Sequence, residues 1–286
     1  MRGDLHLAYA GLVGNASASG GADARARPPA RGRYPTPRRG RPLRLPERGR
    51  GRRPPVPQPH GRGAAVVFDL DRARVVRVGG IRFPDGIAYA PEADKLFVSD
   101  ERGAADVVID ARTLRKRATV ALGGKAGNTH YDSVSKCMLV AVQTRGELVA
   151  LDPATERVVA RYPVPGVQGP HGFTLDEPGR RAFVTGEGNA ALAVVDLRTM
   201  RVVQRLRVGD DPDVLAWDPG WRRLYVASES GVLSTFSAAS DTLVALGDLR
   251  APHAHTVAVD PRTHRVYLPL ENVGGRPVLR ALAPSA

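Results

Sequence analysis

Short runs of apolar, β-branched residues recur along the chain and are separated by turns rich in Gly, Pro and Asp. Five of these runs are Lys95–Ser99, Cys137–Val142, Arg181–Thr185, Arg223–Ser228 and Arg265–Leu270. Their short length and β-branched composition are typical of strands. No segment sustains a 3.6-residue apolar period over three turns, which argues against helices. The pattern therefore predicts an all-β protein.

A repeat of about 42 residues organises these strands. Five aligned segments begin at Asp85, Gly127, His171, Asp213 and His255, at spacings of 42, 44, 42 and 42 residues. Each predicted first strand is followed by a second strand, and most repeats continue with a third and a fourth. The third strands are Ala105–Ile109, Glu147–Leu151, Leu192–Val195 and Val232–Phe236, and the fourth are Arg117–Leu122, Val158–Val164, Val202–Val208 and Leu243–Leu249. Four strands in such a unit indicate a β-propeller blade rather than a sandwich.

The repeat length predicts seven blades, because 286 residues divided by 42 gives about 6.8. Upstream, Ala65–Phe68 and Arg74–Val78 repeat the third and fourth strands, and Leu5–Ala10 resembles a strand of the repeat. The pattern leaves open whether the first blades are degenerate. The last repeat ends at its third strand, Val278–Leu282, so its fourth strand comes from the N-terminal region or is missing. A missing strand would expose a sheet edge.

Composition divides the chain into three parts: a possible first-blade strand at 1–17, an Arg/Pro/Gly-rich segment at 18–63, and a propeller at 64–286. Residues 21–63 hold 13 Arg, no Lys and two acidic residues, Asp23 and Glu47, which accounts for +11 of the net charge of +13. The propeller is therefore nearly neutral, and no basic groove is expected on it. We expect 18–63 to be disordered or a non-native reading of a damaged blade. The alternative is an Arg-rich arm that binds RNA or DNA.

The sequence restricts the compartment only weakly. Cys137 is the single cysteine, so no intrachain disulfide can form. No run approaches the roughly 18 apolar residues of a membrane span. Leu5–Val13 and Ala16–Ala18 have some features of a signal peptide, but Asp4 and His6 interrupt the pattern. The localisation is left unknown, with a cytoplasmic location favoured by the weak signal, and a monomer is expected.

The candidate chemistry lies where each first strand begins. In a propeller these positions converge on one end of the central channel, which we call the mouth. Asp85, His171, Asp213 and His255 occupy this position in four repeats, and the neighbour Asn128 adds a polar group. These five residues are the candidate ligand-binding set. Two His and two Asp could hold a divalent metal or bind a small polar or anionic ligand. The alternative is that they only satisfy turn backbone groups.

Two motifs resemble the YncE-like, YVTN-repeat β-propeller family. Arg223–Ser228 and Lys95–Ser99 are similar to its YVTN strand, and Val149–Val159 and Val195–Val203 are similar to its strand–turn–strand segment. The resemblance covers about 64–282 and implies a propeller fold. It also implies export to the periplasm or secretion, because members of this family are often exported. These motifs are structural and imply no particular chemistry.

Three functions remain open from the sequence. The first is a non-enzymatic binding or scaffold protein that recognises a small ligand or a protein partner at the mouth. The second is a metal-dependent hydrolase of the lactonase type, in which a channel metal activates water. That reaction needs a carboxylate base, and no Glu stands in the first-strand register. The third is nucleic-acid binding through the Arg-rich arm. No catalytic residues and no required cofactor are assigned.

Overall fold

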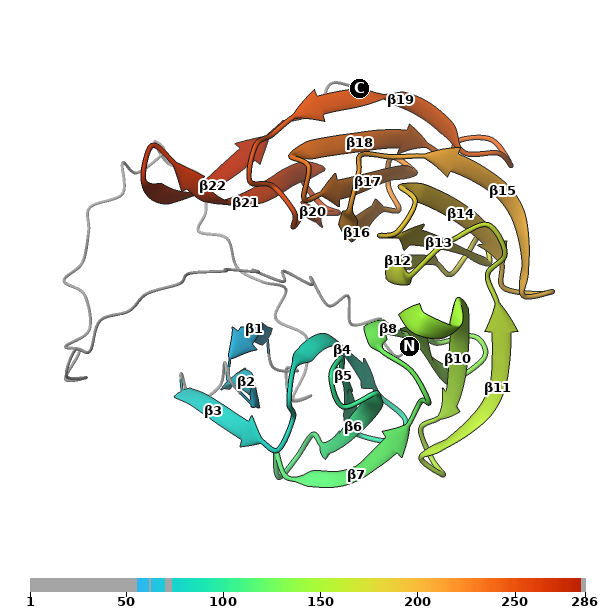
Figure 1. Cartoon of the computed structure of the whole chain (residues 1–286), viewed down its shortest axis with the longest axis vertical. Coiled ribbons are helices and arrows are strands. Elements are labelled where there is room, and N and C mark those ends of the chain that lie inside the picture. The colour runs from blue at the N-terminus through green and yellow to red at the C-terminus, as the bar shows by residue number, and fades with distance from the viewer. Residues whose placement is uncertain (1–55, 62, 70–73, 284–286) are drawn as a thin grey trace.

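Strands form nearly all the regular structure of the chain. The computed structural model describes residues 56–61, 63–69 and 74–283, which form six antiparallel sheets and one short 3-10 turn, Gln143–Arg145. The sheets follow one another in chain order around an arc, and within each complete sheet the first strand lies nearest the centre (Figure 1). The outermost strands, such as Arg157–Pro163 and Arg201–Arg207, alternate between exposed and half-buried positions, as expected of an outer edge.

Four sheets are complete four-stranded blades. The first complete blade consists of β4 Pro84–Ala90, β5 Lys95–Asp100, β6 Ala105–Asp110 and β7 Lys116–Ala121, and the second of β8 Ala126–Asp132, β9 Cys137–Val142, β10 Glu147–Asp152 and β11 Arg157–Pro163. The third consists of β12 Pro170–Asp176, β13 Arg181–Gly186, β14 Ala191–Asp196 and β15 Arg201–Arg207. The fourth consists of β16 Pro212–Asp218, β17 Arg223–Ser228, β18 Val232–Ser237 and β19 Val244–Arg250. Two sheets have three strands: β1 Val56–Gly61, β2 Ala64–Asp69 and β3 Arg74–Gly79; and β20 Ala258–Asp260, β21 Arg265–Val273 and β22 Arg276–Leu282. The structure confirms the all-β propeller and the four-stranded blade.

The predicted number of seven blades is wrong for the described part of the chain. Five blades begin with an innermost first strand, namely β4, β8, β12, β16 and β20, and the β1–β3 sheet precedes them. The estimate of seven divided the whole chain length by the repeat and included Leu5–Ala10 as a possible strand, although the continuous repeat begins only at Ala65. The predicted strand Leu5–Ala10 lies outside the described residues.

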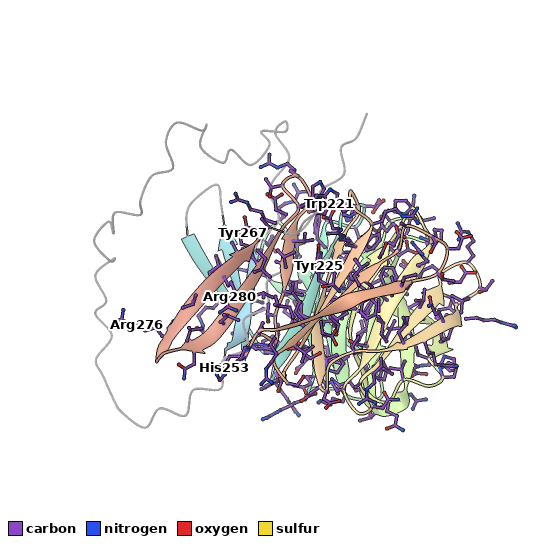
Figure 2. The ribbon with its side chains drawn as sticks, turned by 90° about the horizontal axis from the view of Figure 1, so that it is seen from above. Trp221, Tyr225, His253, Tyr267, Arg276 and Arg280 are labelled. Atoms are coloured by element: carbon purple, nitrogen blue, oxygen red, sulfur yellow. The ribbon has the colours of Figure 1, made fainter. Side chains whose placement is uncertain are left out.

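One strand lies upstream of residue 64, where the sequence pattern placed the start of the propeller. Val56–Gly61 forms β1 and pairs antiparallel with β2, with Val56 opposite Phe68. This strand lies within the 18–63 segment that was expected to be disordered. The sequence did not predict a strand there because the segment contains prolines and a glycine. At the other end, β22 is the predicted third strand of the last blade, and no fourth strand lies beside it among the described residues. The β21–β22 hairpin projects from the ring with Arg276 near its tip (Figure 2).

The core lies between the blades rather than within them. Each of the five buried clusters combines residues of two neighbouring sheets. Ile87 and Tyr89 on β4 pack toward the preceding sheet, whereas Ala88 packs toward the following one. Large side chains thus meet small ones across each interface, which lets the faces interdigitate. A blade cannot bury its apolar faces alone, so its stability depends on its neighbours.

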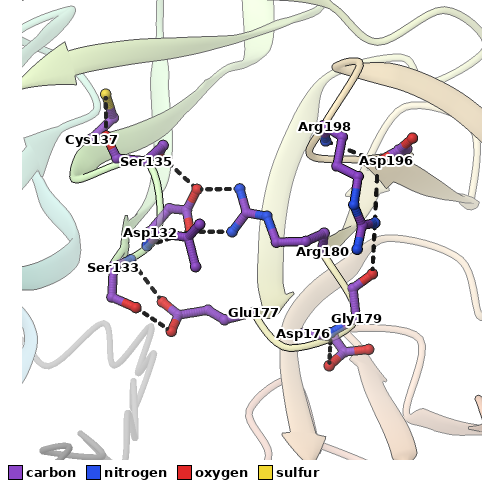
Figure 3. A network of polar contacts seen from close by, with 11 residues as sticks. Asp132, Ser133, Ser135, Cys137, Asp176, Glu177, Gly179, Arg180, Asp196 and Arg198 are labelled. Carbon is purple, nitrogen blue, oxygen red and sulfur yellow. Dashed lines mark hydrogen bonds and ion pairs between the residues drawn. The ribbon is translucent and has the colours of Figure 1, made fainter.

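Ion pairs at the end of the ring opposite the mouth also join neighbouring blades. Arg180, in the β12–β13 turn, makes a bidentate contact of 2.6 and 2.7 Å with the carboxylate of Asp132 at the end of β8 (Figure 3). His264 is in the equivalent turn of a later blade, and its Nδ1 lies 2.8 Å from Oδ2 of Asp218. Both turn residues have positive φ, 53° for Arg180 and 56° for His264. The same turn geometry therefore places a cationic or polar side chain against the preceding blade.

We expect Arg180→Gln to destabilise the protein by about 2–4 kcal/mol, because the Asp132 side chain is only 2 % exposed and would stay buried without its cation. Urea unfolding measures this change. Arg198→Gln is the matched control, because its side chain is 62 % exposed and its contact with Asp196 is 3.8 Å long. Equal and small effects of the two substitutions would contradict a structural role for the Asp132–Arg180 pair.

No helix among the described residues is long and apolar enough to cross a membrane. The only helical segment in this part of the chain is the three-residue 3-10 turn at Gln143–Arg145. The strands account for the apolar sequence instead, and they bury it between sheets.

Candidate functional site

Close backbone contacts bring the first strands together around the mouth. A Cβ atom built on Gly172 would lie 1.8 Å from the carbonyl oxygen of Asp213, and one on Gly86 would lie 2.5 Å from the backbone nitrogen of Thr129. Gly127 is also crowded, since its Cβ would lie 2.9 Å from Cα of His171. Glycine therefore allows neighbouring first strands to approach one another more closely than a side chain would permit. The polar residues at the strand starts converge as a result.

Four of the five predicted site residues form one continuous chain of polar contacts. Nε2 of His171 lies 3.2 Å from Oδ1 of Asp213 and 3.5 Å from Oδ2 of Asp85. The other oxygen of Asp213 lies 3.1 Å from Nδ1 of His255. These residues come from three complete blades and the segment that leads into β20. The sequence register thus identified side chains that meet in space, although they are 42 residues apart or more.

The charge state of this chain follows from its burial and its carboxylates. Burial alone would lower the pKa of His171, but Asp85, Asp213 and Glu187 raise the pKa to about 10. Burial likewise opposes ionisation of Asp213, but hydrogen bonds with His171 and His255 hold its pKa well below the usual range. At neutral pH, His171 is therefore an imidazolium held among carboxylates. Its contacts on both sides place it at the centre of the mouth.

A second ring of polar residues was missed in the sequence. Glu101, Gln143, Glu187 and Glu229 each follow the second strand of a blade. Their backbone N–H groups donate to the carbonyls of the residues that lie two positions before the mouth register. These acceptors are Phe83, Lys125, Gly169 and Asp211, at N–O distances of 2.9, 2.8, 3.2 and 2.8 Å. The signal was present, because these residues and Glu271 are spaced by 42, 44, 42 and 42 residues. The first-strand register, on which the prediction rested, contains no Glu.

The second ring contacts the first directly. Oε1 of Glu187 lies 3.2 Å from Nδ1 of His171, and the Gln143 side-chain amide also contacts that nitrogen. A protonated imidazole accepts no hydrogen bond, so the amide oxygen of Gln143 is the atom that suits this contact. Lys125 pairs with Glu101 at 2.6 Å. His171 thus has acidic or amide partners on both ring nitrogens.

The mouth carries more negative than positive charge. Burial raises the pKa of Asp85 to about 6, with contributions from Asp213 and Glu101 against the opposing effect of His171. Burial also raises the pKa of Glu229, and the carboxylates of Asp211, Asp213 and Glu187 add to that rise. Carboxylates raise the pKa of one another when they are close. A positive charge placed at the mouth would relieve this repulsion.

The fifth predicted residue, Asn128, and a nearby histidine, His253, lie apart from the four contacting residues. Asn128 is buried on β8 and lines a cavity inside the ring. His253, a neighbour of the mouth register, is exposed and has a φ of 64°. Among the residues that the structure describes, no group of three or more His, Cys, Asp and Glu side chains is arranged to hold a metal ion. The contacts of His171 are with carboxylates and the Gln143 amide, and His255 contacts Asp213 and the Thr256 hydroxyl.

Comparisons with known proteins establish the class of the fold, a β-propeller. Kuenenia stuttgartiensis hydrazine synthase matches with a TM-score of 0.59 and 16 % identity, over 73 % of this chain and 68 % of that one. The β-propeller domain of Myceliophteria thermophila Cps50 (Swd1) matches with a TM-score of 0.56 and 16 % identity, over 77 % of this chain and 79 % of that one. No protein-family model and no curated protein matches the sequence. The resemblance to YncE-like proteins therefore remains a prediction from the motifs.

Proposed function

We propose that this propeller is a non-enzymatic binding protein whose mouth recognises a small cationic ligand or a basic segment of a partner protein. The observation that carries the proposal is the His171-centred cluster, in which four blade positions and Glu187 form one set of contacts. A rigid ring that presents side chains from several blades suits recognition rather than bond cleavage. The resemblance to YncE-like propellers supports the same role.

The charge of the two rings favours a cation. Asp85, Asp213, Glu101, Glu187 and Glu229 are acidic and border the mouth. Lys125 is paired with Glu101, and His171 is enclosed by carboxylates, so both positive charges are already compensated. The Glu187 side chain is 29 % exposed, whereas His171 is 9 % exposed. An incoming ligand therefore reaches the outer carboxylates before it reaches the imidazolium.

Spermidine is a suitable probe because it is small and carries several positive charges. We expect the wild-type protein to bind it at low ionic strength and the double variant Glu187→Gln, Glu229→Gln to bind it about tenfold more weakly. Each removed charge lowers the attraction by about 1 kcal/mol or less in a solvent-exposed setting. Isothermal titration calorimetry measures the affinity, and added salt should weaken binding.

The matched control removes two carboxylates at the opposite end of the ring. Glu92 and Glu177 lie beyond the ends of β4 and β12, away from the mouth, and contact Tyr131 and Ser133. The Glu92→Gln, Glu177→Gln variant should bind spermidine like the wild type. An equal loss in this control, or no spermidine binding by the wild type, would refute the cationic site. Stronger binding of citrate than of spermidine would instead indicate an anion site on the two histidines.

The two other functions are separated from this one by direct measurements. A lactonase-type hydrolase predicts a stoichiometric divalent metal that is lost in a His171→Ala, His255→Ala variant. A nucleic-acid-binding arm predicts that removal of residues 1–55, which lie outside the described part, abolishes a strongly salt-dependent affinity for RNA or DNA. Neither result is expected if the mouth is the functional site.

A further inference from the structure

A cavity lies inside the ring, among the first strands of four successive blades. Its volume is about 120 Å³, and β8, β12, β16 and β20 contribute to its wall. Those four strands border one side of the centre of the ring in Figure 1. The cavity is separate from the mouth cluster, because none of Asp85, His171, Asp213 and His255 lines it.

The wall of this cavity has polar and apolar surface in similar amounts, and Thr174 on β12 adds a hydroxyl group to it. Phe173, Trp217 and Val259 are among its apolar residues, whereas Asn128 and His130 on β8 provide polar groups. The His130 ring packs edge-on against Phe173, with centroids 4.8 Å apart and an interplanar angle of 66°. His130 occupies a register position that is Ala or Thr in the other repeats. The side chain that departs from the repeat therefore borders the cavity.

Burial keeps His130 neutral at physiological pH. Desolvation lowers the pKa of His130 to about 4, although a hydrogen bond with the Phe173 backbone opposes the change. A neutral imidazole presents one donor and one acceptor nitrogen. No described Asp, Glu, Lys or Arg side chain lines the cavity, so a charged ligand would be buried there without an ionic partner, which is costly.

We propose that this cavity binds a small neutral aromatic molecule with one hydrogen-bonding group, of about the size of phenol. An apolar cavity of about 150 Å³ in another protein holds benzene, so a volume of about 120 Å³ suits one six-membered ring. Asn128 and His130 lie on the side where a hydroxyl group would form hydrogen bonds. Phe173 and Trp217 provide aromatic surfaces for the ring.

The ligand would enter from the end of the channel opposite the mouth. Val214 is 5 % exposed, whereas Trp217 and Val259, further along their strands, are half-buried. Exposure of the wall thus increases with distance from the mouth. The proposed cavity site is therefore independent of the cationic site, and the carboxylate variants that test the mouth should leave the cavity unchanged.

Phenol, benzene, benzoate and benzylammonium form a matched set of probes. We expect phenol to bind with a dissociation constant of about 1 mM or tighter, which corresponds to about 0.6 kcal/mol per heavy atom. Benzoate and benzylammonium should bind at least tenfold more weakly than phenol. Isotope-edited NMR of the full chain measures all four affinities and shows which residues respond.

Two substitutions test whether binding occurs in this cavity. Ala258→Leu should fill the space and weaken phenol binding at least tenfold, whereas Ala245→Leu on the exposed β19 should leave it unchanged. His130→Phe removes the imidazole but keeps a ring and leaves Asn128 in place, so the preference for phenol over benzene should fall. The ratio of the phenol affinity to the benzene affinity is measured on the His130→Phe variant, so it remains informative if Ala258→Leu fails to fold. Three results would overturn the proposal. They are phenol binding that survives both substitutions, binding of benzoate equal to that of phenol, and no phenol binding by the wild type at 10 mM, which is roughly ten times the expected dissociation constant.

Discussion

Replacing Gly172 with alanine is expected to destabilise the protein by about 3 kcal/mol or more. The added Cβ would lie 1.8 Å from the backbone oxygen of Asp213 and 2.9 Å from Cδ1 of Leu215. The closest neighbour is backbone in the next first strand, so the clash can be relieved only by moving that strand. Urea unfolding of Gly172→Ala should show a large fall in the free energy of unfolding. The same shift would move Asp213 away from His171, so spermidine binding at the mouth should also weaken.

Gly79→Ala is the matched control for this substitution. Gly79 ends β3 and is exposed, and no atom lies within 4 Å of the position that an added Cβ would take. Alanine there should be neutral or slightly stabilising, because it restricts the unfolded chain without a clash. If Gly172→Ala were as stable as Gly79→Ala, the close approach of β12 and β16 would not be a structural requirement.

The glycine requirement illustrates how much of the fold the repeat predicts. The strands were predictable because β-branched runs end at Gly, Pro and Asp in every unit, and the structure places strands there. The equivalent of Gly172 is Val214 in one repeat and Thr256 in another, so the register alone does not demand glycine. Only the distance between two particular strands creates the demand. The strand β1 was missed for a related reason, since its pairing with β2 overrides a sequence rich in proline.

The candidate site was predictable where it follows the period and not elsewhere. The position of Asp85, His171, Asp213 and His255 in one register was sufficient to predict their convergence. Glu187 follows the same spacing at the end of another strand, and a comparison of second-strand ends would have found it. The cavity near His130 is different, because its volume depends on how side chains of four strands fit together. A one-dimensional pattern does not contain that fit.

The largest electrostatic effect is expected from His171→Gln. Removal of the imidazolium leaves Asp85, Asp213 and Glu187 without the cation that they share. Breaking a buried charge pair by removing one partner costs about 3–5 kcal/mol, and we expect a loss of this size at pH 7. His253→Gln is the matched control, because His253 is exposed, and it should be close to neutral. Urea unfolding at several pH values measures both variants.

The pH dependence distinguishes this charge effect from a simple packing defect. The pKa of His171 is about 10 in the folded protein and about 6.5 in an unfolded chain, so its stabilisation is complete below pH 6.5 and lost as the pH rises through 10. The wild-type advantage over His171→Gln should therefore shrink between pH 7 and pH 10. The stability difference should also shrink toward pH 4, because the unpaired carboxylates of the variant accept protons there. At still lower pH, the wild type loses the stabilisation contributed by ionised Asp213. A packing defect would give a difference that does not change with pH, and that result would contradict the assignment of His171 as the charged centre of the mouth.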